Sequence, residues 1–324
     1  MKLVIGTDEA GYGPNLGPLT VSGTAWLISP HDESKSANGF IDLFDVFDRF
    51  FSRCSEPADD RIQVGDSKMI YQSGNGLGGL ERLVMKLVGR PDSWKQLLAD
   101  LGVSEPPDSS SSLPWYQAFN PALPLENAGL TDDLDEVATN KGSRPIAQKS
   151  ALLEPRPFNA GCDRLGNKAS LLSHTTLDIV RQLVESALGT EKGAEIDSVS
   201  VFCDKHGGRS KYAAILQEIF PESWVRVICE GREVSRYEFD WKPVPVEIEF
   251  QARGESHLPV AAASMISKYL REVSMQAFNA FWQERIPNLS PTAGYPVDAK
   301  RFYKEISPEA KELGLREYDW WRNK

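Results

Sequence analysis

Two adjacent carboxylates near the start of the chain have side chains that can bind a cation or move a proton. Asp8 and Glu9 follow an apolar run and precede Gly11 and Gly13. Neighbouring side chains of a strand point to opposite faces, so both acids reach one site only if the strand ends there and the backbone turns. The glycines permit such a turn and let a ligand approach the main chain. The alternative is a turn at a strand end with solvated acids.

Two further acids stand beside expected element ends. Asp204 ends the alternating run 198–204 and precedes two glycines, which is where open α/β sheets place their sites. The alternative for Asp204 is a helix cap. Glu255 precedes three consecutive alanines, Ala261 to Ala263, which let a helix pack closely on a sheet and fix the acid before it. The alternative for Glu255 is an exposed acid in a loop.

These four carboxylates favour hard divalent cations. Mg²⁺ prefers oxygen ligands and keeps several waters. Two such ions about 3.5–4 Å apart support phosphodiester cleavage. The four cysteines and four histidines are scattered without a CxxC pair, so a structural zinc site is not expected.

The elements that would position these acids alternate between strands and helices. Strands are predicted at 2–7, 19–28, 198–204, 223–229 and 244–252. Helices are predicted at 40–53, 79–89, 168–188, about 209–219 and 258–283, with short helices after 284. The order indicates a mixed α/β fold, with a hairpin joining the first two strands. The stretch 103–165 is rich in Ser, Pro, Asp and Asn and is interpreted as part of a long insertion.

Length and charge restrict the class of protein. The chain has 324 residues and a net charge of −10, which argues against non-specific coating of nucleic acid but allows a local basic groove. The residues Lys205, His206, Arg209 and Lys211 are either such a groove or an ordinary surface cluster. No run of 18 apolar residues and no leader pattern is seen, so a cytoplasmic protein without membrane contact is expected.

Several motifs, in order along most of the chain, resemble those of the type 2 ribonuclease H family (ribonuclease HII). Residues 8–14 (DEAGYGP), with Gly17-Pro18, resemble its DEAGRGP…GP opening. Residues 64–68 (VGDSK), Asp204, the helix AAASMISK at 261–268 and Gly294-Tyr295-Pro296 resemble its later motifs. Residues 31–63 and 90–165 are not covered and are interpreted as insertions.

The resemblance implies a ribonuclease H-like fold, a mixed five-stranded sheet flanked by helices. It implies one catalytic domain over 1–283 and a C-terminal helical extension over 284–324 packed on it. It also implies that Asp8, Glu9, Asp204 and Glu255 are the catalytic and metal-binding set, with Mg²⁺ or Mn²⁺. The family has Asp where Glu255 stands, and the spacing to Ser264 is one residue shorter here.

The same resemblance assigns substrate-binding residues. Gly11, Tyr12 and Gly13 would approach the ribose, Ser67 and Lys68 a phosphate, and Tyr295 a sugar. The family has Arg at the position of Tyr12, so recognition of a single embedded ribonucleotide is in question. For Tyr295 a turn tyrosine is the alternative, and for Asp66 and Lys68 a helix cap and a solvated charge.

The implied activity is hydrolysis of the RNA strand of an RNA–DNA hybrid, or of a ribonucleotide-containing duplex, leaving 5′-phosphate and 3′-hydroxyl ends. A non-catalytic nucleic-acid-binding protein is the second hypothesis, and a nuclease of the same fold with another substrate is the third.

Overall fold

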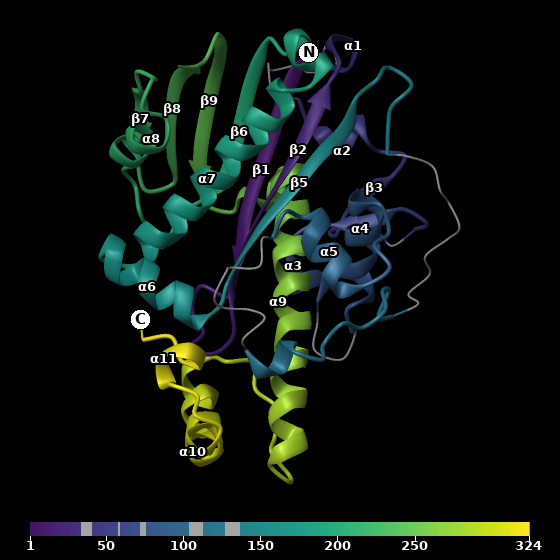
Figure 1. The fold of residues 1–324 in the computed structure, drawn as a ribbon. Helices are drawn as coiled ribbons and strands as arrows, with labels where there is room; N and C mark the ends of the chain where they lie inside the picture. The colour runs from purple at the N-terminus through teal and green to yellow at the C-terminus, as the bar shows by residue number, and fades with distance from the viewer. Residues whose placement is uncertain (34–40, 58, 72–75, 104–112, 127–136, 324) are drawn as a thin grey trace.

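The computed structural model describes residues 1–33, 41–57, 59–71, 76–103, 113–126 and 137–323. A seven-stranded mixed sheet forms its centre, in the order β5-β2-β1-β6-β9-β8-β7 (Figure 1). The strands are β1 (Lys2–Ala10), β2 (Leu19–Ile28), β5 (Arg144–Leu153), β6 (Ser198–Asp204), β7 (Arg226–Glu230), β8 (Val234–Trp241) and β9 (Val244–Gln251). The expected mixed α/β sheet is thus confirmed, with seven strands in place of five.

Within the central sheet, the sequence prediction lacks two strands, β5 and β8. In β8 the apolar side chains of Tyr237, Phe239 and Trp241 are buried and alternate with polar ones, a period-2 signal that the sequence does carry. In β5 nearly every residue is half-buried and no alternation exists, because it is an edge strand paired only with β2. The segment 90–165 therefore contributes a strand to the central sheet.

Strand β1 occupies the middle of the hydrogen-bonded core. It pairs antiparallel with β2 from Lys2 to Ala10, which confirms the expected hairpin. It pairs parallel with β6 from Lys2 to Thr7, and β6 pairs parallel with β9. The carboxyl ends of β1, β6 and β9 consequently meet at one edge of the sheet.

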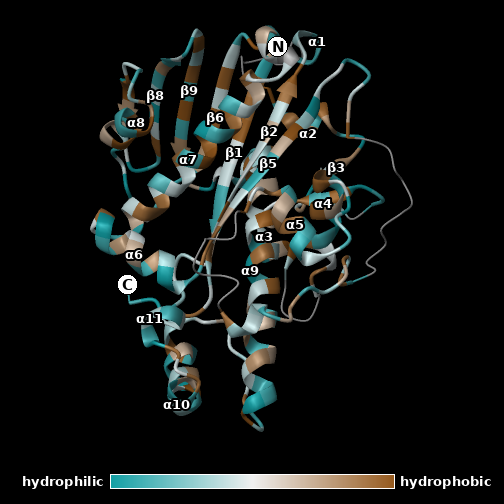
Figure 2. Cartoon of the chain, in the orientation of Figure 1, coloured by the Kyte–Doolittle hydropathy of each residue, from teal (hydrophilic) through white to brown (hydrophobic). Residues whose placement is uncertain are grey.

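Two long helices cover opposite faces of these strands (Figure 1). Helix α9 (Leu258–Arg285) lies against β1 and β2 so closely that a Cβ at Gly6 would meet the Pro259 carbonyl carbon at 2.2 Å. Helix α7 (Lys168–Leu188) lies on the other face, where Gly23 makes room for Ile179 and Leu183. In Figure 2 the central strands carry mainly apolar and intermediate residues, as expected for a sheet covered on both faces.

The remaining elements surround this centre. A second, two-stranded sheet pairs β3 (Phe51–Arg53) with β4 (Ile62–Val64). The other helices are α1 (Pro30–Glu33), α2 (Leu43–Val46), α3 (Ser67–Ile70), α4 (Gly78–Val88), α5 (Trp94–Asp100), α6 (Pro155–Leu165) and α8 (Ala213–Ile219), with 3-10 turns η1 (Pro114–Tyr116), η2 (Glu191–Glu195) and η3 (Gly254–Ser256).

The helix predicted over 40–53 is wrong. Only α2 is helical there, and the chain then turns into β3. Its aromatic residues have helical spacing, but Phe47 and Phe51 instead pack against Trp26 of β2, so tertiary packing overrides the local pattern. Residue 40 of this segment, the preceding residues 34–39 and the Ser-rich stretch at 104–112 lie outside the described residues.

A separate hydrophobic cluster fills the C-terminal end of the molecule. Helices α10 (Pro296–Glu312) and α11 (Glu317–Trp320) pack there against the end of α9, through Trp282, Phe302 and Trp320. The tail was expected to hold short helices, whereas α10 has 17 residues. Leu16, from the turn between β1 and β2, is a fully buried member of the same cluster.

Among the described residues, no helix combines the length and the apolar character needed to cross a membrane.

Candidate active site

The edge where β1 and β6 end carries the first two acids. The strand does not end at them as expected, because β1 stays paired with β2 to Ala10. Its pairing with β6 stops at Thr7, so the two strands separate just before Asp8. Strand alternation therefore holds, and Asp8 and Glu9 leave opposite faces of β1.

Asp8 lies on the face covered by α9. Its side chain is 7% exposed; Oδ1 accepts the Glu9 amide at 2.8 Å, and Ser264 of α9 also hydrogen-bonds to it. The pKa of Asp8 is raised to about 8; burial is the largest cause, the charges of Asp204 and Glu255 add to it, and the Ser264 hydrogen bond opposes them. A carboxylate placed this way is expensive to ionise without a nearby positive charge.

The other three acids share that electrostatic environment. Burial raises the pKa of Glu9 well above its usual range, and the charges of Asp8 and Asp204 add to this. Burial also raises the pKa of Asp204 and Glu255, and the charge of Asp204 raises that of Glu255 further. The structure thus brings all four sequence-predicted acids into mutual interaction.

Asp204 also organises the loop that carries Glu255. Its Oδ1 accepts the amides of Arg253 at 3.1 Å and Gly254 at 3.4 Å. Arg253 has φ of 65°, so the chain turns sharply there before η3 and α9. The interpretation of Asp204 as a cap for the following helix is wrong, since its carboxylate binds a loop 49 residues further on.

Residues 66–68 approach the acids from a different direction. The Asp66 side chain accepts the Lys68 amide and caps α3, as its alternative interpretation held. Ser67 is buried, and its hydroxyl lies 3.1 Å from the Ser264 hydroxyl that also contacts Asp8. The exposed Lys68 side chain lowers the pKa of Glu9, Asp204 and Glu255. The motif at residues 66–68 is therefore connected to the acids in two ways: Ser67 contacts Ser264, which contacts Asp8, and the Lys68 ammonium acts on the other three acids by its charge.

The donor set fits a hard divalent cation in its chemistry. It consists of carboxylate oxygens, whose ionised form is disfavoured by burial and by the charges of the neighbouring acids and would be favoured by a bound cation. Within the described ranges, however, no group of three or more His, Cys, Asp or Glu is arranged so that it could hold one ion.

The two glycines after the acids, Gly11 and Gly13, differ in backbone conformation and in the space around them. Gly11 has φ of 87°, and a Cβ there would lie 2.5 Å from both Arg271 Nε and the Pro18 carbonyl oxygen, so glycine is required. Gly13 needs no such conformation, and a Cβ there would meet nothing within 4 Å. The backbone at Gly13 is consequently open to a ligand.

Tyr12, between the two glycines, is half-buried. Its hydroxyl packs against Gly207, where a Cβ would lie only 2.4 Å from the hydroxyl oxygen. The Lys168 ammonium lies 4.8 Å from the Tyr12 ring centroid. Burial raises the pKa of Tyr12, with Glu9 adding to the effect. The ring is thus held between the loop after β6 and the start of α7.

Tyr295 lies at the other side of the turn. It precedes α10 and is 53% exposed. The Gly294 carbonyl accepts the Asn15 amide at 2.8 Å, and a Cβ at Gly294 would lie 2.5 Å from the Leu16 carbonyl oxygen. Tyr295 is thereby attached to the turn after β1.

The basic residues after Asp204 do not form one exposed patch. Lys205 Nζ donates to the Gly231 carbonyl and to the Ser235 hydroxyl, both at 2.8 Å. His206 is 1% exposed, and burial lowers its pKa to about 3, so it is neutral. These two residues are structural, and the interpretation as a basic groove is wrong for them.

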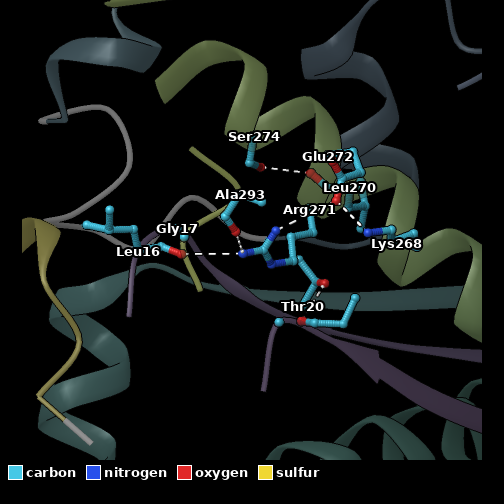
Figure 3. A network of polar contacts seen from close by, with 12 residues as sticks. Leu16, Gly17, Thr20, Lys268, Leu270, Arg271, Glu272, Ser274 and Ala293 are labelled. Carbon is cyan, nitrogen blue, oxygen red and sulfur yellow. Dashed lines mark hydrogen bonds and ion pairs between the residues drawn. The ribbon is translucent and has the colours of Figure 1, made fainter. Parts of the chain in front are cut away.

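Sequence reasoning missed a buried polar cluster beneath the turn. Arg322 is 0% exposed and donates to the carbonyls of Gly11 and Tyr12. Arg271 donates to the Ala293 carbonyl at 2.9 Å and to that of Leu16 at 3.4 Å (Figure 3). Glu154 is buried beside them and accepts the Tyr116 hydroxyl at 2.6 Å. Arg322 follows no motif or periodicity, so no sequence signal identifies it.

Comparison with known proteins gives structural likenesses alone. No protein-family model and no curated protein matches the chain. Ribonuclease H2 from Pyrococcus horikoshii has 15% identity and a TM-score of 0.48, over 98% of this chain and 92% of its own. Ribonuclease HII of Archaeoglobus fulgidus, solved in complex with PCNA, has 15% identity and a TM-score of 0.42, over 99% and 94%. Ribonuclease H3 of Aquifex aeolicus has 12% identity and a TM-score of 0.37, over 98% and 70%. Identities and TM-scores this low carry no argument about function.

Proposed function

We propose that this protein is an endonuclease that hydrolyses the RNA strand of RNA–DNA hybrids with the help of Mg²⁺ or Mn²⁺. The observation that carries the proposal is the gathering of Asp8, Glu9, Asp204 and Glu255 at one edge of the sheet, with the pKa of each raised by burial. The resemblance of the surrounding motifs to ribonuclease HII supports the choice of substrate.

In this proposal the four acids hold the cations. Two divalent ions bound by carboxylates supply a nucleophile at neutral pH and stabilise the leaving oxygen in phosphodiester hydrolysis. Cleavage of the P–O3′ bond by water leaves 5′-phosphate and 3′-hydroxyl ends.

The chain offers groups for the substrate on both sides of the acids. Lys68 is an exposed cation beside them and is assigned to a phosphate. Tyr295 is exposed and is assigned to a sugar. The backbone of residues 11–13 approaches the ribose, and Tyr12, held between Gly207 and Lys168, replaces the arginine of the family.

The direct test is a cleavage assay on an RNA–DNA hybrid with Mg²⁺ and with Mn²⁺. Wild-type protein is expected to cut the RNA strand, and Asp204→Asn is expected to be inactive. The proposal is refuted if the wild type cleaves no hybrid with either metal, or if the variant cleaves it at the same rate as the wild type.

A non-catalytic nucleic-acid-binding protein is the second candidate. It is favoured by the lack, among the described residues, of three acids arranged around one point. It predicts that hybrid binding persists in EDTA while no cleavage occurs with either metal. Comparison of a hybrid, a duplex with one ribonucleotide and a DNA duplex tests the third candidate, a nuclease with another substrate, which fails if only ribose-containing strands are cut.

A further inference from the structure

Arg322, two residues from the end of the chain, is a fully buried cation. Its Nη1 donates to the Gly11 carbonyl at 2.6 Å, and its Nη2 donates to the Tyr12 carbonyl at 3.1 Å. Its guanidinium carbon lies 4.0 Å from the ring centroid of Phe158. The pKa of Arg322 is lowered to about 9, chiefly by burial and also by the charge of the nearby Arg271. Burial of a charge lowers the free energy of unfolding unless hydrogen bonds compensate for the lost hydration. Here the hydrogen bonds go to the backbone of the turn beside the acids.

The main chain around Arg322 is also held by hydrogen bonds on both sides. The Arg322 amide donates to the Asn15 carbonyl at 2.9 Å, and Asn15 Nδ2 donates to the Arg322 carbonyl at 3.0 Å. On the other side, Asn159 of α6 donates to the Trp321 carbonyl at 2.8 Å and accepts the Asn323 amide at 3.0 Å. The segment 321–323 therefore lies fixed between α6 and the turn, so the guanidinium has a defined place.

The direction of the carbonyls decides the direction of the neighbouring amides. In a trans peptide the C=O and the following N–H point to opposite sides. Because the carbonyls of Gly11 and Tyr12 face Arg322, the amides of Tyr12 and Gly13 face away from it. In the described part of the chain neither amide has a hydrogen-bond acceptor. Gly13 is exposed, with open space where a Cβ would stand.

We propose that Arg322 is a positioning residue, which holds the 11–13 backbone so that the amides of Tyr12 and Gly13 are offered to oxygen atoms of the substrate strand. The inference rests on the proposed function and adds to it a residue from the opposite end of the chain. The acceptor is a ribose hydroxyl or a phosphate oxygen, and both suit an amide donor.

The test compares Arg322→Lys with Arg316→Lys. Lysine keeps the charge of Arg322 but cannot bind two carbonyls with one planar fork. Arg316 belongs to the same C-terminal segment, and within the described residues its guanidinium donates hydrogen bonds to Asp319, so it is the matched control. Arg322→Lys is expected to raise KM for the hybrid about tenfold with little change in kcat, because a displaced donor pair weakens substrate positioning. The control is expected to keep the wild-type KM.

Amide hydrogen exchange gives a readout that does not depend on activity. Faster exchange over residues 11–17 in Arg322→Lys, with an unchanged rate in β1, is expected. If the variant does not fold, the wild type still tests the inference. The amide signals of Tyr12 and Gly13 are expected to shift in a ¹⁵N spectrum when hybrid is added in EDTA.

The outcomes separate the two claims. If wild-type protein cuts the hybrid and Arg322→Lys keeps the wild-type KM, this inference alone fails. It also fails if the Tyr12 and Gly13 signals do not move on binding, or if the control changes KM equally. If wild-type protein neither binds nor cuts, the proposed function itself fails. Weaker binding by Arg322→Lys of both hybrid and DNA duplex identifies a phosphate acceptor, whereas weaker binding of the hybrid alone identifies the ribose hydroxyl.

Discussion

The acids at the end of β1 and the turn that follows them are neighbours in sequence but are held by different parts of the molecule. Asp8 and Glu9 belong to a strand flanked by β2 and β6 and covered by α7 and α9. Residues 11–17 belong instead to the C-terminal cluster, through Leu16, and to Arg322 and Arg271. Residues 8–17 are therefore held in place by two hydrophobic cores, the one around the central sheet and the C-terminal cluster.

The difference suggests a division of work. The sheet gives the acids a rigid and partly buried place, which is what raises their pKa values. The turn receives its geometry from hydrogen bonds to backbone carbonyls, so its side chains can vary while its shape is kept. Changes in the first region are expected to alter kcat, and changes in the second are expected to alter KM.

The largest effect is expected from Asp204→Asn. It removes a charge from the acid cluster and weakens the acceptor that holds the loop before Glu255. Loss of a metal-binding carboxylate is expected to lower kcat on the hybrid by roughly 10³-fold or more. Steady-state cleavage measures this, and Asp240→Asn, an exposed acid on β8, is the control. A loss confined to KM would contradict the division between the two regions.

Lys68→Met tests the cation beside the acids. Because Lys68 lowers the pKa of Glu9, Asp204 and Glu255, its removal raises all three. The acids then ionise at higher pH, so the acidic limb of the kcat/KM profile is expected to move to higher pH. Loss of a phosphate contact is also expected to raise KM about tenfold.

A pH–rate profile from pH 5 to 9 gives the measurement. Lys304→Met, an exposed lysine of α10, is the matched control and is expected to keep both the profile and KM. An unshifted acidic limb in Lys68→Met would show that the ammonium does not act on the acids that limit the rate.

Leu16→Ala tests the second core. Leu16 is fully buried in the C-terminal cluster, so truncation is expected to lower the free energy of unfolding by about 2–4 kcal/mol. The disturbed turn is expected to raise KM severalfold. Leu172→Ala, equally buried on α7 in the main core, is expected to cost similar stability and leave KM unchanged. Equal KM values in the two variants would remove the distinction between the cores.

The smallest effect is a gain of stability in Asp8→Asn. The folded-state pKa of about 8 lies above the ordinary aspartate value of 3.8, so the folded protein binds this proton more tightly than the unfolded chain does. Ionisation therefore costs stability as pH rises from about 4 to about 8. Asparagine removes that cost, and Tm in EDTA is expected to exceed that of wild type by about 2–6 °C at pH 8 but to match it near pH 4.

Thermal unfolding in EDTA at both pH values measures this. An equal difference at pH 4 and pH 8 would mean that the titration of Asp8 is not its cause. Saturating Mg²⁺ is expected to raise the Tm of wild type at pH 8 and to raise that of the variant less, because a ligand stabilises only the state it binds.

The sequence was most informative where local patterns agree with the tertiary structure. The hairpin of β1 and β2, the helix α7 and the strand β6 ending in Asp204 were predicted with boundaries close to those observed. It was least informative where packing overrides local spacing, as at 40–53. The edge strand β5 escaped prediction because its half-buried residues show no period.

For the site, residue types and their placement beside element ends determined which acids to expect together. Their interaction could be anticipated because parallel strands bring their carboxyl ends to one edge. Two details depended on the three-dimensional structure: the separation of β1 from β6 after Thr7, and the contact of Arg322, 311 residues further on, with Gly11. Pairing across such distances follows from the packing of whole elements, which no short stretch of sequence encodes by itself.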